Sequence, residues 1–340
     1  MNFNRTIIAA LAILTLAFVS CKKDDEDESY FTFSGNIEIA EYIPSYVTPG
    51  QVIRMTPSGT RKDSTDPDTP VIKYSFYAKP FMTSRDTTDC WVFTVPDSLC
   101  TMNVSVYASA PGYYSQSYEF SIVIVDPAQS LTNVFYNRFG GTFKDPRDSR
   151  VYPYTKIAGK DWMEKNLAYC EFGKAYMSVE DSGYDAMTDI FGMYYTWDQA
   201  VKACPEGWRL PSDQDWTDMC QTLTEAPLTT LEVFPGIASK LMCNARLNDE
   251  RLWTYYTISK PEPDASYMNL LPAGFANISG DTYYFESSLS SAAFWTSTEY
   301  DSEKAYCRYL YNNSKNADVQ AHPLYKDFVA TTVRCIRDAE

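Results

Sequence analysis

Residues 204–212 read Cys-Pro-Glu-Gly-Trp-Arg-Leu-Pro-Ser, and they separate two segments with the features of short helices. Residues 194–203 contain no proline or glycine and place alanines among polar residues, which predicts a helix. Pro205 ends this helix because proline lacks the backbone N–H that a further turn needs. Ser212 precedes acidic and then apolar residues, as expected for a helix N-cap. The stretch therefore predicts two consecutive short helices, with a cysteine at the end of the first.

Further motifs lie on both sides of this stretch. They are Gly140-Gly141-Thr142-Phe143, Asp145-Pro146-Arg147-Asp148, Trp162-Met163-Glu164-Lys165-Asn166-Leu167, Trp197-Asp198-Gln199-Ala200, Leu271-Pro272-Ala273-Gly274, Phe294-Trp295-Thr296-Ser297-Thr298-Glu299 and Val333-Arg334-Cys335-Ile336-Arg337-Asp338. In this order the motifs resemble the Fibrobacter succinogenes major paralogous domain, a family found in surface proteins of Fibrobacter and Bacteroidetes. The resemblance covers about Gly140 to Asp338, and we assign residues 140–340 to this domain.

The same order of elements resembles a C-type-lectin-like domain, which implies an α+β fold for residues 140–340. In that fold the cysteine at the end of the first helix pairs with a cysteine of the last strand. Carried onto this chain, the resemblance implies a disulfide between Cys204 and Cys335. Such a bridge would close a loop of about 130 residues, for which the chain-entropy model predicts roughly 4 to 5 kcal/mol of stabilisation.

The other cysteines leave several pairings open. The chain has nine cysteines, and assigning Cys21 to a lipid leaves an even number. Cys90 and Cys100 flank the apolar run 91–95 and are a second candidate pair. The cysteines that the sequence cannot pair are Cys170, Cys220, Cys243 and Cys307. A metal site is not expected, since there is no Cys-x-x-Cys or Cys/His spacing and His322 is the only histidine.

Residues 30–126 have the pattern of an all-β sandwich. Short apolar or alternating runs are separated by Pro, Gly, Asp and Ser, which predicts strands joined by turns. The predicted strands are Phe31–Ile39, Val52–Met55, Val71–Tyr77, Trp91–Val95, Met102–Ala108 and Tyr118–Val125. This region resembles an immunoglobulin-like domain of the kind that holds a functional head away from a bacterial surface. We interpret residues 127–139 as the linker between the two domains.

The N-terminal residues have the features of a bacterial lipoprotein signal. Residues 1–20 combine Arg5 with an apolar run that is too short to span a bilayer as a helix. Phe18-Val19-Ser20-Cys21 resembles the lipobox, which implies cleavage before Cys21 and lipid attachment to this cysteine. Residues 21–29 form a charged tether that resembles the export signal of Bacteroidetes surface lipoproteins. We therefore expect a protein anchored by lipid in the outer membrane and exposed at the cell surface.

Composition excludes one class of partner. The formal net charge is −15, from 29 Lys and Arg against 44 Asp and Glu, whereas binding to nucleic acid requires clustered basic residues. The chain is 45% hydrophobic and 15% aromatic, which suffices for a packed core and suggests two domains. A folded extracellular part that does not bind nucleic acid is the expected outcome.

No motif for catalysis occurs in the sequence. His322 is not placed beside a serine or cysteine nucleophile by any motif. Asp213 and Asp215 could suggest a glycosidase pair, but acids in the first turn of a helix are expected because they interact with the helix dipole. The lectin-like fold is shared with formylglycine-generating oxidases, yet Cys307 and Cys335 are too far apart to match their reactive cysteine pair. We therefore expect that the protein is not an enzyme and uses no cofactor.

Binding is the function that remains. Glu262-Pro263-Asp264 looks similar to a calcium-dependent sugar-binding loop, but residues 294–299 lack the second half of the calcium ligands. Trp208 and Trp295 could stack on sugars, although tryptophans within such motifs more often fill the core. We expect a non-catalytic module that binds an extracellular glycan or protein. The alternative is a structural or adhesive component of a surface assembly without a small ligand. The sequence identifies no ligand-binding residues.

Overall fold

The computed structural model describes residues 30–65, 71–175, 186–229, 232–253, 262, 265–311 and 318–339. The predicted signal peptide (1–20), Cys21 and the tether (21–29) lie outside these residues. The described chain divides into two compact units between Ile124 and Val125. Within the described ranges, no helix has the length and apolar character needed to cross a membrane.

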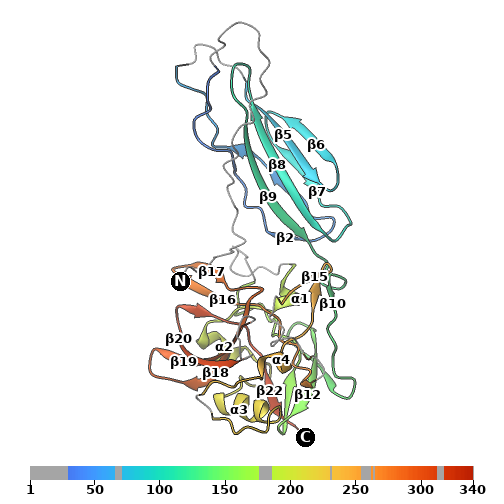
Figure 1. The fold of residues 1–340 in the computed structure, drawn as a ribbon, viewed down its shortest axis with the longest axis vertical. Helices are drawn as coiled ribbons and strands as arrows, with labels where there is room; N and C mark the ends of the chain where they lie inside the picture. Colours follow the sequence, from blue (N-terminus) through green and yellow to red (C-terminus); the bar gives the residue numbers. More distant parts are fainter. Residues whose placement is uncertain are drawn as a thin grey trace. The chain divides into compact units, whose positions relative to one another are not determined.

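The first unit consists of strands. They are β1 (Glu38–Ile39), β2 (Tyr46–Val47), β3 (Val52–Met55), β4 (Pro57–Ser58), β5 (Lys73–Lys79), β6 (Thr83–Thr87), β7 (Trp91–Thr94), β8 (Thr101–Ser109) and β9 (Gln116–Ile124). One sheet has the order β2-β9-β8-β5-β6, β3 pairs with β7, and β1 pairs with β4. The long strands β5, β8 and β9 lie side by side (Figure 1). The first unit is therefore β-rich, as its sequence pattern predicts.

Alternating burial explains why these strands enclose a core. In β8, alternate side chains from Met102 to Ala108 are buried, and those between them face outward. Strand β7 shows the same alternation, and Trp91 of β7 packs against Phe76 of β5 with ring centroids 5.5 Å apart. Side chains of both sheets belong to one apolar cluster. Because successive side chains of a strand point to opposite faces, each sheet has one apolar face, and these two faces pack against each other.

The predicted Cys90–Cys100 disulfide is not formed, because both cysteines are free thiols. Cys90 directly precedes β7 and Cys100 directly precedes β8, and these strands belong to different sheets. A strand rises about 3.3 Å per residue, so β7 carries the chain about 13 Å away from Cys90. A disulfide requires a Cα separation of about 4.4 to 6.8 Å. Cysteines that flank one strand are therefore held apart by the length of that strand.

The second unit combines small sheets with short helices. Its elements are β10 (Leu131–Thr132), β11 (Gly141–Lys144), β12 (Val151–Ile157), β13 (Lys160–Met163), α1 (Thr188–Phe191), α2 (Trp197–Ala203), α3 (Asp213–Gln221), α4 (Ala238–Leu241), β14 (Arg246–Leu247), β15 (Glu250–Arg251), β16 (Phe275–Ser279), β17 (Thr282–Glu286), β18 (Ser291–Glu299), β19 (Lys304–Tyr311), β20 (Val319–Tyr325), β21 (Val329–Ala330) and β22 (Ile336–Asp338). The sheets have the orders β11-β12-β13-β22, β18-β19-β20, β17-β16-β21 and β10-β14-β15. Helix α3 packs on β18 and β19 (Figure 1).

Local sequence explains both of the longer helices. The side chain of Ser212 accepts a hydrogen bond from the backbone of Asp215, whose carboxylate accepts one in return, so the predicted N-cap of α3 is confirmed. Helix α2 ends at Ala203 with Cys204 as its C-cap, before Pro205, as predicted. It begins only at Trp197, because the preceding tyrosines extend to form bridges with other segments. The predicted helix over 194–203 is therefore shorter than expected at its start.

A disulfide joins Cys204 to Cys335, with a Cα–Cα distance of 5.8 Å. This pairing, which the lectin-like resemblance implies, is confirmed. The bridge spans a sequence separation of 131 residues and connects the end of α2 to the residue before β22. Strand β22 in turn pairs with β13, so the end of the second unit lies beside its first hairpin.

Residues 127–139, expected as a linker, are packed on the second unit. Leu131 and Thr132 form β10, which pairs with β14. The carbonyl oxygen of Phe135 accepts a hydrogen bond from Asn269 Nδ2 at 2.9 Å, and the Asn137 backbone N–H donates to Glu164 at 3.1 Å. We call residues 131–137 the strap. The linker interpretation is wrong for the strap, because partners distant in sequence hold it in place.

Candidate functional site

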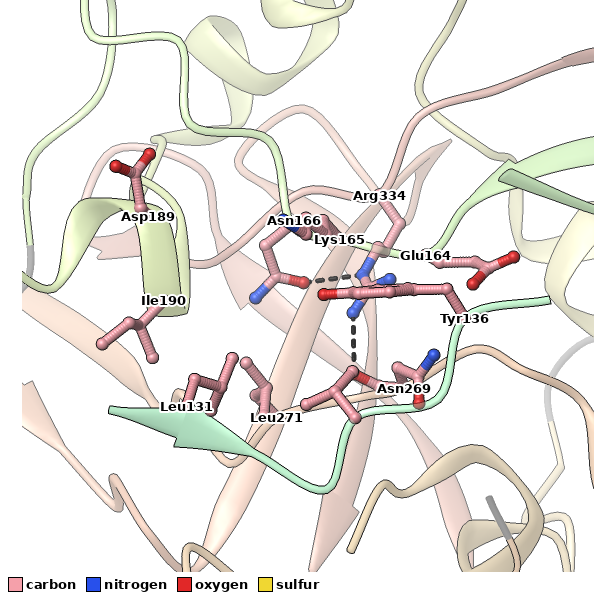
Figure 2. Close-up of a pocket in the computed structure, with 11 residues that line it drawn as sticks. Leu131, Tyr136, Glu164, Lys165, Asn166, Asp189, Ile190, Asn269, Leu271 and Arg334 are labelled. Atoms are coloured by element: carbon pink, nitrogen blue, oxygen red, sulfur yellow. Dashed lines mark hydrogen bonds between the residues drawn. The ribbon is translucent and has the colours of Figure 1, made fainter. Parts of the chain in front are cut away.

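A polar pocket in the second unit has the strap as one of its walls (Figure 2). Its cavity volume is about 10 Å³, which is about the room that one water molecule needs. Small-molecule sites usually measure about 300 to 1,000 Å³, so this pocket is much smaller than such a site. Its lining residues are Leu131, Val134, Tyr136, Glu164, Lys165, Asn166, Asp189, Ile190, Asn269, Leu271 and Arg334.

Arg334 is the buried cation of this pocket, and its exposed fraction is only 1%. Its guanidinium donates to Asn166 Oδ1 at 2.6 Å, to the Met163 carbonyl at 3.0 Å and to the Asn269 carbonyl at 3.1 Å. Each of these acceptors is uncharged. Burial lowers the pKa of Arg334 to about 10, so the side chain remains protonated at neutral pH. The pocket therefore carries a fixed positive charge at its wall.

Two buried oxygens of the pocket have no hydrogen-bond donor among the described residues: Glu164 Oε1 and Asn269 Oδ1. The other carboxylate oxygen of Glu164 accepts from the backbone of Asn137, and Asn269 Nδ2 donates to two carbonyls. A buried acceptor without a donor costs about 1 to 3 kcal/mol. The residues around the pocket thus include two buried oxygens whose hydrogen-bonding capacity is unfilled among the described residues.

A second feature of this unit is a group of aromatic side chains at its surface, which we call the aromatic cluster: Tyr300, Tyr306, Tyr325 and Phe328. Ring centroids of Tyr300 and Tyr306 lie 5.4 Å apart, and those of Tyr325 and Phe328 lie 6.1 Å apart. Tyr300, Tyr325 and Phe328 are 53%, 45% and 61% exposed. Lys304 places its amine 4.4 Å from the ring centroid of Tyr325.

Strand pairing places Tyr306 and Tyr325 of the aromatic cluster near each other, while Tyr300 and Phe328 follow the ends of β18 and β20. Lys304 lies opposite Tyr325 in the antiparallel pair β19–β20, and Tyr306 lies opposite Pro323. Residues directly opposite each other, and residues two apart along a strand, share a face of a sheet. The other half of this face is covered by α3, where Arg308 is fully buried. The aromatic cluster is therefore the uncovered end of a sheet face.

The Fibrobacter succinogenes major domain matches residues 155–337, more than half of the chain. The chain belongs to this family. Among solved structures it is similar to the Yersinia pseudotuberculosis adhesin InvE, at 11% sequence identity over 86% of this chain and 71% of that chain, with a TM-score of 0.21. No curated protein matches the chain. Glu164, Asn269 and Arg334 lie within the Fibrobacter succinogenes major domain, and the strap precedes the matched residues.

The tryptophans of the Fibrobacter succinogenes major domain that could stack on sugars are buried instead. Trp295 is fully buried and donates from its indole N–H to the Tyr195 carbonyl at 3.0 Å. Trp208 packs against Phe143 and lies under the guanidinium of Arg337, 4.7 Å from the ring centroid. Their assignment to the core is confirmed. The exposed rings of the aromatic cluster lie outside the quoted motifs, which explains why sequence reasoning missed them.

The acids of α3 have structural partners. Asp215 completes the N-terminal cap and pairs with Arg209 at 2.7 Å. Asp213 Oδ1 lies 2.6 Å from Nε of the buried Arg308. The interpretation of both acids as part of a helix terminus is confirmed. The ion pair of Asp213 could not be read from the sequence, because Arg308 is distant in the chain.

The remaining candidates for chemistry have unreactive surroundings. His322 Nε2 lies 3.0 Å from Gln320 Oε1, and burial lowers the pKa of the imidazole. Cys220, Cys243 and Cys307 are buried, and burial raises the pKa of each thiol to about 12, so they stay protonated. Cys170 is partly buried, and burial raises its pKa as well.

The segment Glu262-Pro263-Asp264, which looks similar to a calcium-dependent sugar-binding loop, is described only in part, because residues 263–264 lie outside the described residues. Glu262 Oε1 accepts a hydrogen bond from Ser239 Oγ at 3.4 Å. Among the residues that the structure describes, no group of three or more His, Cys, Asp or Glu side chains is arranged to hold a metal ion.

Glu164 predicts a pH dependence of stability. Burial raises its pKa from 4.5 to about 7, against the opposing effects of the Asn137 N–H and Arg334. The folded chain therefore binds a proton that the unfolded chain releases between these values, so this group makes stability fall as pH rises from 4.5 to 7. We expect Glu164→Gln to remove a pH-dependent loss on the order of 3 kcal/mol.

The measurement is the urea unfolding midpoint of the wild type and of Glu164→Gln at several values between pH 4.5 and 8. The difference between the two proteins isolates Glu164 from other titrating groups, Asp213 among them, whose pKa is also raised by burial. Parallel pH profiles for the two proteins would contradict the prediction.

Proposed function

We propose that this protein is a non-catalytic binding module of the outer membrane, held at the cell surface by a lipid on Cys21, that binds glycans through its aromatic cluster. The observation that carries the proposal is the half-exposed state of three rings, Tyr300, Tyr325 and Phe328, next to the amine of Lys304. Exposed rings offer apolar faces to the C–H faces of sugars, and the tyrosine hydroxyl and lysine amine offer hydrogen bonds.

The C-type-lectin-like fold of the second unit and the immunoglobulin-like fold of the first are part of this proposal. The bridge from the end of α2 to the residue before β22 supports the lectin-like fold, because the resemblance implies that pair. The two sheets of the first unit, packed around one core, support the immunoglobulin-like fold. The high pKa of the buried thiols supports a role without covalent catalysis.

We expect the double variant Tyr325→Ala/Phe328→Ala to weaken glycan binding at least about 10-fold, because central aromatic contacts carry much of the energy of an interface. The measurement is a glycan array with the full-length protein, followed by titration of the strongest glycan. Phe139→Ala is the matched control, because Phe139 is 97% exposed and lies outside the aromatic cluster.

Equal binding by the double variant and the wild type would show that the aromatic cluster is not the contact surface. An array without any bound glycan would favour the alternative function, a structural or adhesive component of a surface assembly, whose partner is a protein. Pull-down of surface proteins by the wild type but not by Tyr325→Ala/Phe328→Ala would then identify the same surface in that role.

The anchor has its own test. Cys21→Ala removes the thiol that the lipid would modify, so the protein should move from the membrane fraction to the soluble fraction. Protease added to intact cells should remove the wild-type ectodomain, since the tether 21–29 resembles a surface-export signal. Membrane association of Cys21→Ala that matches the wild type would contradict lipid anchoring, and complete protection of intact cells would contradict surface exposure.

A further inference from the structure

Charged side chains lie next to the rings of the aromatic cluster, and most of them are acids. The two segments that carry the cluster, 299–306 and 325–328, contain four acids and two lysines, which leaves a net charge of −2. The acids, all exposed, are Glu299, Asp301, Glu303 and Asp327. Charge therefore opposes the binding of an anionic group at this surface and favours the binding of a cationic group.

One of the lysines shows how this part of the chain binds an ammonium group. The amine of Lys326 lies 4.5 Å from the ring centroid of Trp197 and 2.6 Å from Glu299 Oε2, and the lysine side chain is only 10% exposed. The amine also donates to the backbone carbonyl of Asp301 at 3.1 Å. A ring face and a carboxylate thus hold this cation together, because both attract positive charge.

A ring and a carboxylate also adjoin each other at Tyr300, whose side chain is 53% exposed. Asp301 follows this ring in the turn between β18 and β19, and its Oδ1 accepts the backbone N–H groups of Glu303 and Lys304 at 2.8 Å each. These hydrogen bonds hold the carboxylate in the turn. Among the residues that the structure describes, no cation lies over the ring of Tyr300 or of Phe328. The exposed rings and acids can therefore receive a cation from a ligand.

Other classes of ligand match this surface less well. A neutral glycan would stack on the rings and gain nothing from the acids, and a glycan with carboxylate or sulfate groups would be repelled by them. A basic peptide has the required charge, but its lysine side chains would lose rotamer freedom on binding, whereas a sugar ring is already rigid. An amino sugar combines the required charge with a rigid ring.

We propose that the aromatic cluster takes glycans with free amino groups, and that the ammonium group lies against an exposed ring and the carboxylates of the β18–β19 turn. This inference rests on the proposed function, because it names the class of glycan for the same surface. Attraction between exposed charges is screened by salt, so binding should weaken as the ionic strength rises.

The test is isothermal titration calorimetry of the full-length protein, at a slightly acidic pH at which sugar amines are protonated. The probes are tetrasaccharides of glucosamine, N-acetylglucosamine, glucose and glucuronic acid with the same linkage, so that they differ in an amine, an acetamide, a hydroxyl and a carboxylate. We expect the glucosamine probe to bind at least about 10-fold more tightly than either neutral probe, and the glucuronic acid probe to bind most weakly. Equal affinity for the glucosamine and N-acetylglucosamine probes overturns the inference.

The triple variant Asp301→Asn/Glu303→Gln/Asp327→Asn removes the negative charge at nearly constant shape. Asparagine at position 301 keeps an acceptor for the two backbone N–H groups, so the turn stays closed. We expect this variant to lose the preference for the glucosamine probe and to keep its affinity for the neutral probes. An unchanged preference in the triple variant overturns the inference.

The matched control is Glu206→Gln/Asp249→Asn/Glu250→Gln, which removes three exposed acids outside the two segments and should keep the preference. Tighter binding of tetralysine than of the glucosamine probe would indicate a basic protein partner and overturns the inference. Neutral probes that bind as tightly as the glucosamine probe, and that Tyr325→Ala/Phe328→Ala no longer binds, would refute the amine preference alone. Equal binding of all probes by the wild type and by Tyr325→Ala/Phe328→Ala would refute the proposed function itself.

Discussion

Cys335→Ser should lower the free energy of unfolding by about 2 to 5 kcal/mol, the usual cost of removing a native disulfide from an exported domain. The bridge to Cys204 spans 131 residues, so its loss frees most of the second unit in the unfolded state. Cys335 is also fully buried, and a serine hydroxyl in its place would lose its hydration. The measurement is the urea unfolding midpoint of the wild type and the variant under non-reducing conditions.

The double variant Cys204→Ser/Cys335→Ser is the control for this prediction. A reducing agent should lower the midpoint of the wild type and leave that of the double variant unchanged, because only the first contains the bridge. Peptide mapping without reduction should recover the two cysteines in one cross-linked pair. Unchanged stability of Cys335→Ser, or recovery of Cys204 as a free thiol from the wild type, would contradict the pairing.

Asp213→Ala should cost about 3 to 5 kcal/mol, the usual effect of removing one partner from a buried ion pair. Asp213 Oδ1 lies 2.6 Å from Arg308 Nε, and the side chains are 2% and 0% exposed. Arg308 also lies over the ring of Phe234, 4.2 Å from its centroid, so it cannot turn to water without disturbing the core. The variant therefore leaves a buried cation without its carboxylate, and thermal or urea unfolding would report the loss.

Two further variants distinguish the effect of the buried charges on stability from the effect of side-chain packing. Asp213→Leu/Arg308→Met replaces both charges by apolar side chains and should recover much of the lost stability, since an apolar pair avoids the cost of desolvation. Asp338→Ala breaks the exposed pair with Lys160 and should change unfolding little. A loss in Asp213→Ala no larger than that in Asp338→Ala would show that the buried pair does not stabilise the fold.

The sequence predicted those parts of the fold that depend on neighbouring residues or that the family resemblance implies. The cap at Ser212 and the end of α2 before Pro205 depend on neighbouring residues, and the alternation in β3 and β8 lies within single strands. The Cys204–Cys335 pair came from the resemblance to a lectin-like domain. Strand β6 was not predicted, because its residues are mostly exposed and show no alternation, and pairing with β5 alone fixes it.

The candidate sites were less predictable because they join residues that are far apart in sequence. Strap residues near 136 meet Glu164, Asn269 and Arg334 only after folding, and the strap lies between the two predicted domains, which led to its interpretation as a linker. The aromatic cluster depends on the register of β19 and β20, which places Lys304 opposite Tyr325. The sequence alone does not show this register, so it does not show which tyrosines gather at the surface.

The bridge between Cys204 and Cys335 also sets how far this chain can be stretched. A covalent cross-link prevents the residues between its ends from lengthening under tension, even when every hydrogen bond among them is broken. At about 3.3 Å per extended residue, unfolding of the 131-residue separation would lengthen the chain by about 430 Å, and the disulfide prevents this extension. If the chain is pulled from an anchor at its N-terminal end, as proposed, it would therefore lengthen through the residues before Cys204, while residues 204–335 stay a closed loop.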